Sequence, residues 1–258
     1  MKRSRRARDK RRNRIAVFVI AVFGVVVLSV NAVGQFVAEK ILYPLVNATG
    51  TASETVTREA QPETLTVYLL SYGACPSAAE AEQTRGDCRA KGGGAFLWQE
   101  QELFFMTDSC YLSREKAQTR KKTNEQLSLR EVRTPSLRFR LTGKMEQIET
   151  CEACLSAAAD CVREVLAAAE KTEDGATGYL QTRAVLQDWE TTLKQRQAEL
   201  NALTGDHPVV RALRECLACA LAALSESPAA SDNDFLPKLR FVTCALAGGY
   251  LAFCAECA

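Results

Sequence analysis

A stretch of 24 residues without a charged side chain, residues 15–38, constrains this chain most. It begins IAVFVIAVFGVVVLSV at Ile15 and exceeds the length of about 20 residues that a bilayer-spanning helix needs. Nine of the first 14 residues are Lys or Arg, and a basic flank of this kind stays in the cytoplasm. We therefore expect a basic cytoplasmic tail over residues 1–14, a single membrane-spanning helix over residues 15–38, and an extracytoplasmic remainder.

A cleaved signal peptide is the alternative interpretation of the same segment. Val30 and Ala32 are small enough for a signal peptidase site, and the central apolar run is short. Both interpretations export the rest of the chain, so they differ only in whether the protein stays anchored in the cell membrane.

Composition limits the classes of function. The 258 residues are 47% hydrophobic and 25% charged, which is typical of a globular protein. Beyond residue 14 the chain has 24 Lys/Arg against 30 Asp/Glu, and an acidic body has no general reason to bind nucleic acid. His207 is the single histidine, which excludes a multi-histidine metal site.

A linker and a small α/β domain follow the membrane segment. The stretch from Leu45 to Glu63 is rich in Thr, Ala, Glu and Ser with almost nothing to bury, and we place a flexible linker at residues 39–63. The run LTVYLLSY, residues 65–72, is typical of a strand, and Ser77 is a candidate N-cap for the helix after it, as Ser113 is for the second helix of the domain. We place the domain at residues 64–141.

This domain contains an internal repeat. A shift of 36 residues superimposes Tyr68 on Phe104, Leu70 on Met106, Ser77 on Ser113 and Ala81 on Ala117. A duplicated strand–helix unit predicts a βαββαβ sheet with both helices on one face. The last strand should come from Leu129–Leu141, where Pro135 interrupts the strand pattern, so that the sequence does not fix the bounds of this strand.

Residues 64–125 resemble the SPOR-like domains, which are small extracytoplasmic βαββαβ modules of bacterial membrane proteins. The resemblance rests on VYLLSYGACPSAAEAE, on the turn and strand AKGGGAFLW, and on LFFMTDSCYLSREKAQ. The tail, membrane helix and linker are similar too. The resemblance implies binding to the glycan strands of peptidoglycan, in cell division or sporulation.

Five residues are candidates for glycan contact. The family usually carries Gln where Ser71 stands and Arg at the position that corresponds to Phe105. Sugars also stack on aromatic rings. We therefore expect these residues on an exposed face of the sheet: Ser71, Tyr72, Trp98, Phe105 and Tyr111. Side-chain alternation leaves a second interpretation open, in which half of these rings belong to the core against the helices. The residues that replace the family's Gln and Arg leave open a further interpretation, in which the module has lost its sugar site.

The second predicted helix of the domain carries a run of basic residues. They are Arg114, Lys116, Arg120, Lys121 and Lys122. Such a run indicates either a solvated helix face or a surface that meets an anionic wall polymer or phospholipid head groups.

Residues 142–258 change to a helical period. Four amphipathic stripes, separated by breaks near Asp174-Gly175, Gly205–Pro208 and Ser225–Asp234, predict a helical bundle. The last stripe has about 15 apolar residues, which is too short to span a bilayer. We expect it to be a core helix, with Gly248-Gly249 allowing close approach of a neighbour. If the module has lost its sugar site, the protein is instead a scaffold whose bundle docks an envelope protein.

The chain has eleven cysteines, and six of them form three Cys-x-x-Cys pairs. The pairs are Cys151/Cys154, Cys216/Cys219 and Cys254/Cys257. Each lies within a helical stripe, where buried thiols pack as small hydrophobic groups. Disulfides between helices and metal or redox chemistry are the alternatives.

No motif assembles an active site. Gly92-Gly93-Gly94 follows a helix and precedes a strand, the reverse of a phosphate-binding loop. His207 precedes Pro208 and suits a turn better than a catalytic base. We expect a non-enzymatic α+β protein without catalytic residues, metal or cofactor, whose partners are peptidoglycan glycan strands, the membrane and an envelope protein.

Overall fold

The computed structural model describes residues 55–100, 102–203 and 207–258. The predicted tail, membrane helix and first part of the linker lie outside them. The strands are β1 (Val56–Ala60), β2 (Thr66–Ser71), β3 (Phe96–Glu100), β4 (Leu103–Tyr111), β5 (Ser128–Arg133) and β6 (Phe139–Gly143). The helices are α2 (Ala78–Gln83), α3 (Arg85–Ala90), α4 (Arg114–Lys122), α5 (Met145–Glu173), α6 (Tyr179–Ala202), α7 (Pro208–Ser225) and α8 (Phe235–Glu256).

The predicted α+β class is confirmed. A four-stranded antiparallel sheet has the order β3-β4-β2-β5, and a two-stranded sheet pairs β1 with β6. The order along the chain from β2 to β5 is strand, helix, strand, strand, helix, strand, with the first helical segment divided into α2 and α3 at Thr84.

The two halves of the repeat use the same local interactions. The Ser77 hydroxyl accepts a hydrogen bond from the Glu80 backbone N–H, and the Ser113 hydroxyl accepts one from Lys116. Both serines are the N-caps that the sequence predicts. Ala81 and the equivalent Ala117 are fully buried, because a small side chain lets each helix lie close to the sheet.

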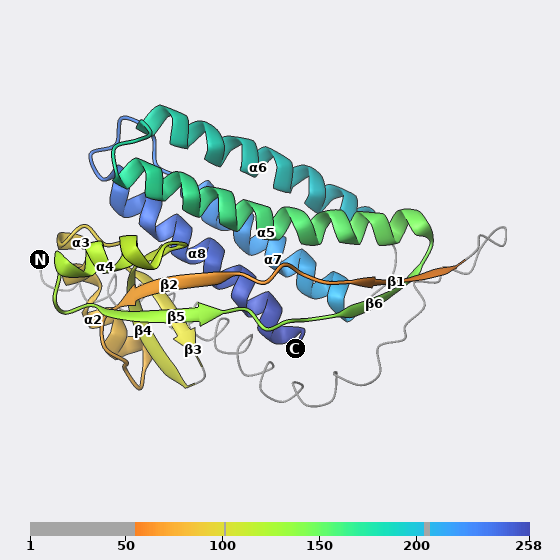
Figure 1. The fold of residues 1–258 in the computed structure, drawn as a ribbon, viewed down its shortest axis with the longest axis horizontal. Helices are drawn as coiled ribbons and strands as arrows, with labels where there is room; N and C mark the ends of the chain where they lie inside the picture. The colour runs from red at the N-terminus through yellow and green to blue at the C-terminus, as the bar shows by residue number, and fades with distance from the viewer. Residues whose placement is uncertain (1–54, 101, 204–206) are drawn as a thin grey trace, which may run out of the picture. The chain divides into compact units, whose positions relative to one another are not determined.

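The end of the predicted linker is part of the fold, which corrects the boundary at residue 63. Strand β1 pairs with β6 from Val56↔Gly143 to Ala60↔Phe139. The backbone N–H of Thr134 donates to the Leu65 carbonyl and connects this pair to β2 and β5. The result is one long two-stranded ribbon, which Figure 1 shows below α5 and α6.

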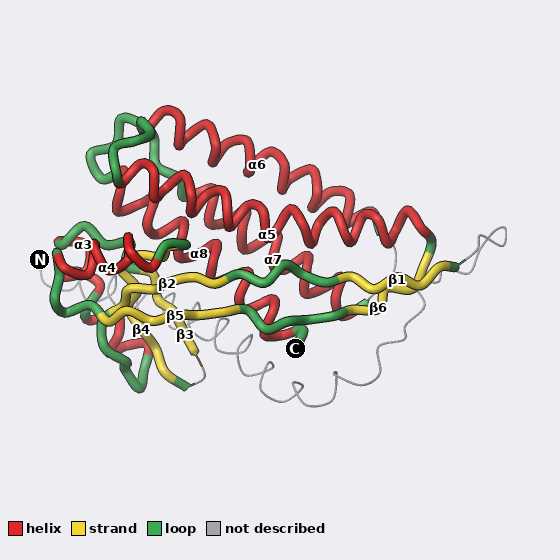
Figure 2. Tube along the Cα trace, in the orientation of Figure 1, coloured by secondary structure: helices red, strands yellow, loops and turns green. Residues whose placement is uncertain are grey.

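The helical region also departs from the expected division into separate domains. Its four helices fall between the predicted breaks, but α8 packs against β3 and β4 as well as against α5 and α7. One hydrophobic cluster joins the sheet, the ribbon and the bundle. Figure 2 shows α5 and α6 above the ribbon, whereas α7 and α8 cross it in this view. The α/β part and the bundle therefore share a core.

Helix α8 is the one helix of the described residues that is long and apolar enough to cross a membrane by length and composition. It contacts α5, α7 and the sheet, and its side chains Val242, Leu246 and Tyr250 are buried. These contacts agree with the expectation of a core helix.

Candidate functional site

The five predicted site residues are all buried, with no side chain more than 8% exposed. They also lie on two faces of the sheet. Trp98 and Phe105 belong to the core shared with the bundle, whereas Tyr72 and Tyr111 belong to a second cluster beneath α2, α3 and α4. The expectation of one exposed platform is therefore wrong.

Helix α8 is the reason that Trp98 and Phe105 are buried. They are cross-strand neighbours on β3 and β4, and α8 lies over that face. A Cβ added at Gly248 of α8 would lie 3.4 Å from the Trp98 ring and 3.3 Å from the Phe96 ring. The Arg130 guanidinium covers Phe105 at 4.1 Å from the ring centre. Gly248 thus allows the close approach that the sequence predicts, with the sheet as the neighbour.

The two tyrosines use their hydroxyls within the protein. The Tyr72 hydroxyl accepts a hydrogen bond from Asn124 at 3.1 Å, and the Tyr111 hydroxyl donates to Glu173 at 2.8 Å. Burial raises the pKa of both phenols. These rings are part of the packing between layers.

The side chain of Ser71 is buried, and its hydroxyl has no hydrogen-bond partner in the protein. Ser71 pairs with Thr107 beside a β-bulge, and neither hydroxyl has a protein partner. Side-chain alternation along β2 places Ser71 on the face that the bundle covers, because Leu70 and Tyr72 lie in the other cluster. The Ser71 hydroxyl is therefore closed off from solvent.

The loop Gly92-Gly93-Gly94 is where α8 meets the sheet. A Cβ at Gly93 would lie 2.4 Å from Asp108 Oδ1, and a Cβ at Gly94 would lie 2.5 Å from the backbone nitrogen of Phe241. Real Cβ atoms do not approach this closely, so both positions need glycine. The sequence marks this loop only as a turn, since nothing near it in the chain reveals α8.

Buried ion pairs surround this loop. Arg120 contacts both Asp108 carboxylate oxygens, at 2.9 and 3.0 Å. Arg240 of α8 lies 2.6 Å from Glu173 of α5 and also donates to the Gly92 carbonyl. These charges are satisfied within the protein, as buried charges must be, and they fix the loop between the sheet and the bundle.

A second carboxylate of α5 supports the start of α4. Glu170 accepts hydrogen bonds from the backbone N–H groups of Leu112 and Ser113, at 2.6 and 2.9 Å. Lys116 lies within ion-pair distance of the same carboxylate. An acidic side chain at a helix N-terminus is favourable, so the bundle stabilises the α/β part here.

The described residues contain no group of three or more His, Cys, Asp or Glu side chains placed to hold a metal ion. His207 is the N-cap of α7, where its Nδ1 accepts from the Val209 backbone N–H at 3.3 Å. This position agrees with the turn residue that the sequence predicts.

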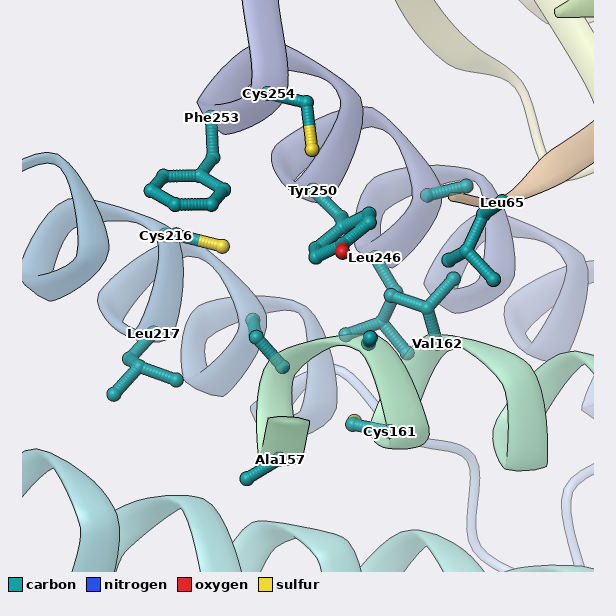
Figure 3. Packing of buried hydrophobic residues seen from close by; sticks show 14 of the residues in the cluster. Leu65, Ala157, Cys161, Val162, Cys216, Leu217, Leu246, Tyr250, Phe253 and Cys254 are labelled. Carbon is teal, nitrogen blue, oxygen red and sulfur yellow. The ribbon is translucent and has the colours of Figure 1, made fainter. Parts of the chain in front are cut away.

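The thiols are parts of the core. All eleven cysteines are free, and eight are buried. Figure 3 shows Cys161, Cys216 and Cys254 among the apolar side chains between α5, α7 and α8. Burial raises the pKa of Cys151 and of Cys254 to about 11. A thiol that stays protonated is a poor nucleophile and metal ligand, which favours packing over redox chemistry.

We expect alkylation at neutral pH to separate the thiols into two sets. Cys219 is exposed, and Cys75 and Cys257 are half-buried, so these three should be labelled in the folded protein. The other eight should react only as fast as the protein unfolds, because the reagent cannot reach them. Differential alkylation with mass spectrometry measures each rate. A buried cysteine that reacts as fast as Cys219 would instead indicate a reactive centre.

Comparisons with protein-family models, curated proteins and solved structures find no significant match to this chain.

Proposed function

We propose that the chain is a membrane-anchored, non-enzymatic protein of the bacterial cell envelope that acts as an interaction scaffold. Its SPOR-like module has lost glycan binding, and its body lies outside the cytoplasmic membrane. The uncharged segment at residues 15–38 behind nine basic residues supports the anchor and the orientation. The strand order β3-β4-β2-β5 supports the SPOR-like module.

One observation carries the proposed loss of glycan binding: α8 occupies the second face of the sheet. Helices α2, α3 and α4 cover one face, and α8 covers the other over Trp98 and Phe105. A glycan strand needs an exposed face with rings available for stacking. With both faces covered by the chain itself, a role as a rigid scaffold fits better than glycan binding.

Glycan binding through this face is the alternative, and it requires α8 to leave the sheet. That movement would expose the apolar side of a helix whose Leu239, Val242 and Leu246 are buried. Exposing each of these large apolar side chains to water would cost about 1.5–3 kcal/mol of folding free energy. We therefore expect the covered state to be the working state of the protein.

A binding measurement on cell-wall sacculi tests the proposal. The full chain in nonionic detergent, kept reduced, should show no saturable retention on sacculi, with or without their stem peptides. Retention that increases on the denuded glycan would contradict the proposal.

The variant Gly94→Val distinguishes a lost sugar site from a masked one. The substitution loosens the contact between the sheet and α8, and circular dichroism would show whether the protein stays folded. A folded Gly94→Val protein that binds glycan would indicate a masked sugar site rather than a lost one.

A further inference from the structure

Four cationic side chains on and beside α4 are exposed and form no ion pair among the described residues. They are Lys91, Arg114, Lys121 and Lys122, which we call the α4 patch. The other two basic residues of the run have internal partners: Lys116 pairs with Asp174 at 2.6 Å, and Arg120 pairs with Asp108. The structure thus separates the basic residues that hold the fold together from those that remain available.

Contacts around Arg120 bring Lys91 into this patch from the preceding helix–strand connection. Arg120 Nη2 donates to the Lys91 carbonyl at 3.0 Å, and Lys91 Nζ donates to the neutral side chain of Gln126. Two exposed carboxylates lie in the same segment, Glu115 and Glu125, and neither forms an ion pair with the patch in the structure. The four cations therefore keep their charge uncompensated by direct contacts.

Helix stability explains only half of the patch. Lys121 and Lys122 lie in the last turn of α4, where cations are favourable against the helix dipole. Arg114 is the first residue of α4, where the dipole disfavours a cation. Lys91 follows α3 and lies outside both helices. A ligand with negative charge accounts for all four positions.

A lipid surface is a second source of negative charge, and the test below treats it as a separate outcome. Helix α4 lies beside β2, β4 and β5, whereas β1 lies at the other end of the ribbon (Figure 1). The location of the ligand in the cell envelope rests on the proposed function.

We propose that the α4 patch binds an envelope polymer with repeating phosphate groups. A lysine ammonium binds phosphate as a point charge, and a single exposed contact is weak. A polymer with many phosphates engages several of these cations at once and releases its counterions, which gives binding that depends strongly on salt. The acidic charge of the rest of the body directs such a polymer to this patch.

Binding of inorganic polyphosphate tests the proposal. The full chain is held in nonionic detergent micelles, in a background where the nine basic residues of the N-terminal tail are changed to Gln. Fluorescence anisotropy of labelled polyphosphate gives Kd. At about 50 mM salt, Lys121→Gln with Lys122→Gln should weaken binding about 10- to 30-fold and reduce its salt dependence.

A matched variant removes the same charge elsewhere. Arg133 and Arg138 are exposed and form no ion pair among the described residues, and changing both to Gln should alter Kd less than about two-fold. Adding phosphatidylglycerol to the micelles should leave polyphosphate binding unchanged, because the proposed ligand is the polymer and not a lipid surface. Three results would overturn the proposal: no binding by the unsubstituted patch, equal loss in both double variants, or competition by the lipid. Binding in micelles does not depend on orientation in a cell, so failure here is distinct from failure of the anchor.

Discussion

Replacing Gly94 by valine should lower the free energy of unfolding by about 3 kcal/mol, which is the upper range for overpacking. A Cβ at this position would lie 2.5 Å from the backbone nitrogen of Phe241 and 2.7 Å from the carbonyl carbon of Arg240. Both atoms belong to the backbone of α8, which cannot move aside without separating from the sheet. Chemical denaturation followed by circular dichroism measures the change.

Gly73→Ala is the matched control for this substitution. A Cβ at Gly73 would have no heavy atom within 4 Å, so the change should stay within about 0.5 kcal/mol. A Gly94→Val protein as stable as Gly73→Ala would mean that α8 does not rest on this loop. The sheet face over Trp98 and Phe105 would then no longer be held closed by this contact.

Arg240→Ala should destabilise the protein by about 3–5 kcal/mol, because it leaves a buried carboxylate without its cation. The carboxylate belongs to Glu173, whose Oε1 lies 2.6 Å from Arg240 Nε. The Arg240 and Glu173 side chains are only 12% and 17% exposed. The substitution also leaves the Gly92 carbonyl without the donor from α8. The expected result is a lower denaturant midpoint with the sheet and the bundle losing structure together.

An exposed ion pair provides the comparison. Arg140 lies 3.7 Å from Glu59, and both side chains are more than 60% exposed. Exposed pairs contribute about 0–1 kcal/mol, so Arg140→Ala should have a small effect. Equal losses for Arg140→Ala and Arg240→Ala would contradict the buried network that joins α5, α8 and the glycine loop.

The sequence predicts the secondary structure well where the signals are local. The caps Ser77 and Ser113 and the four helical stripes follow from patterns within a few residues. The single last strand expected from Leu129–Leu141 is instead two strands, β5 and β6, which pair in different sheets and are separated at Pro135. The function, the membrane helix and the SPOR-like resemblance stay predictions.

The candidate site could not be predicted, because its burial depends on layers that are distant in sequence. Alternation shows that Trp98 and Tyr72 point to opposite faces only once the strand pairing and the bulge are known. Strand β1 looked like linker because three of its five residues are exposed and polar. Its pairing with β6 depends on a segment about 80 residues away.

By itself, the sequence determined the caps of α2 and α4 and the four helices of the bundle, since periodicity and capping act between near neighbours. Only the tertiary structure decided that the sheet has no open face. Arg240 reaches the carbonyl of Gly92 across 148 residues of chain, and Gly94 and Gly248 allow the backbone of α8 and the rings of β3 to approach closely. The sequence does not distinguish a glycine that is needed for a turn from a glycine that is needed because a helix packs against it. The packing partner distinguishes them, and it is known only from the tertiary structure.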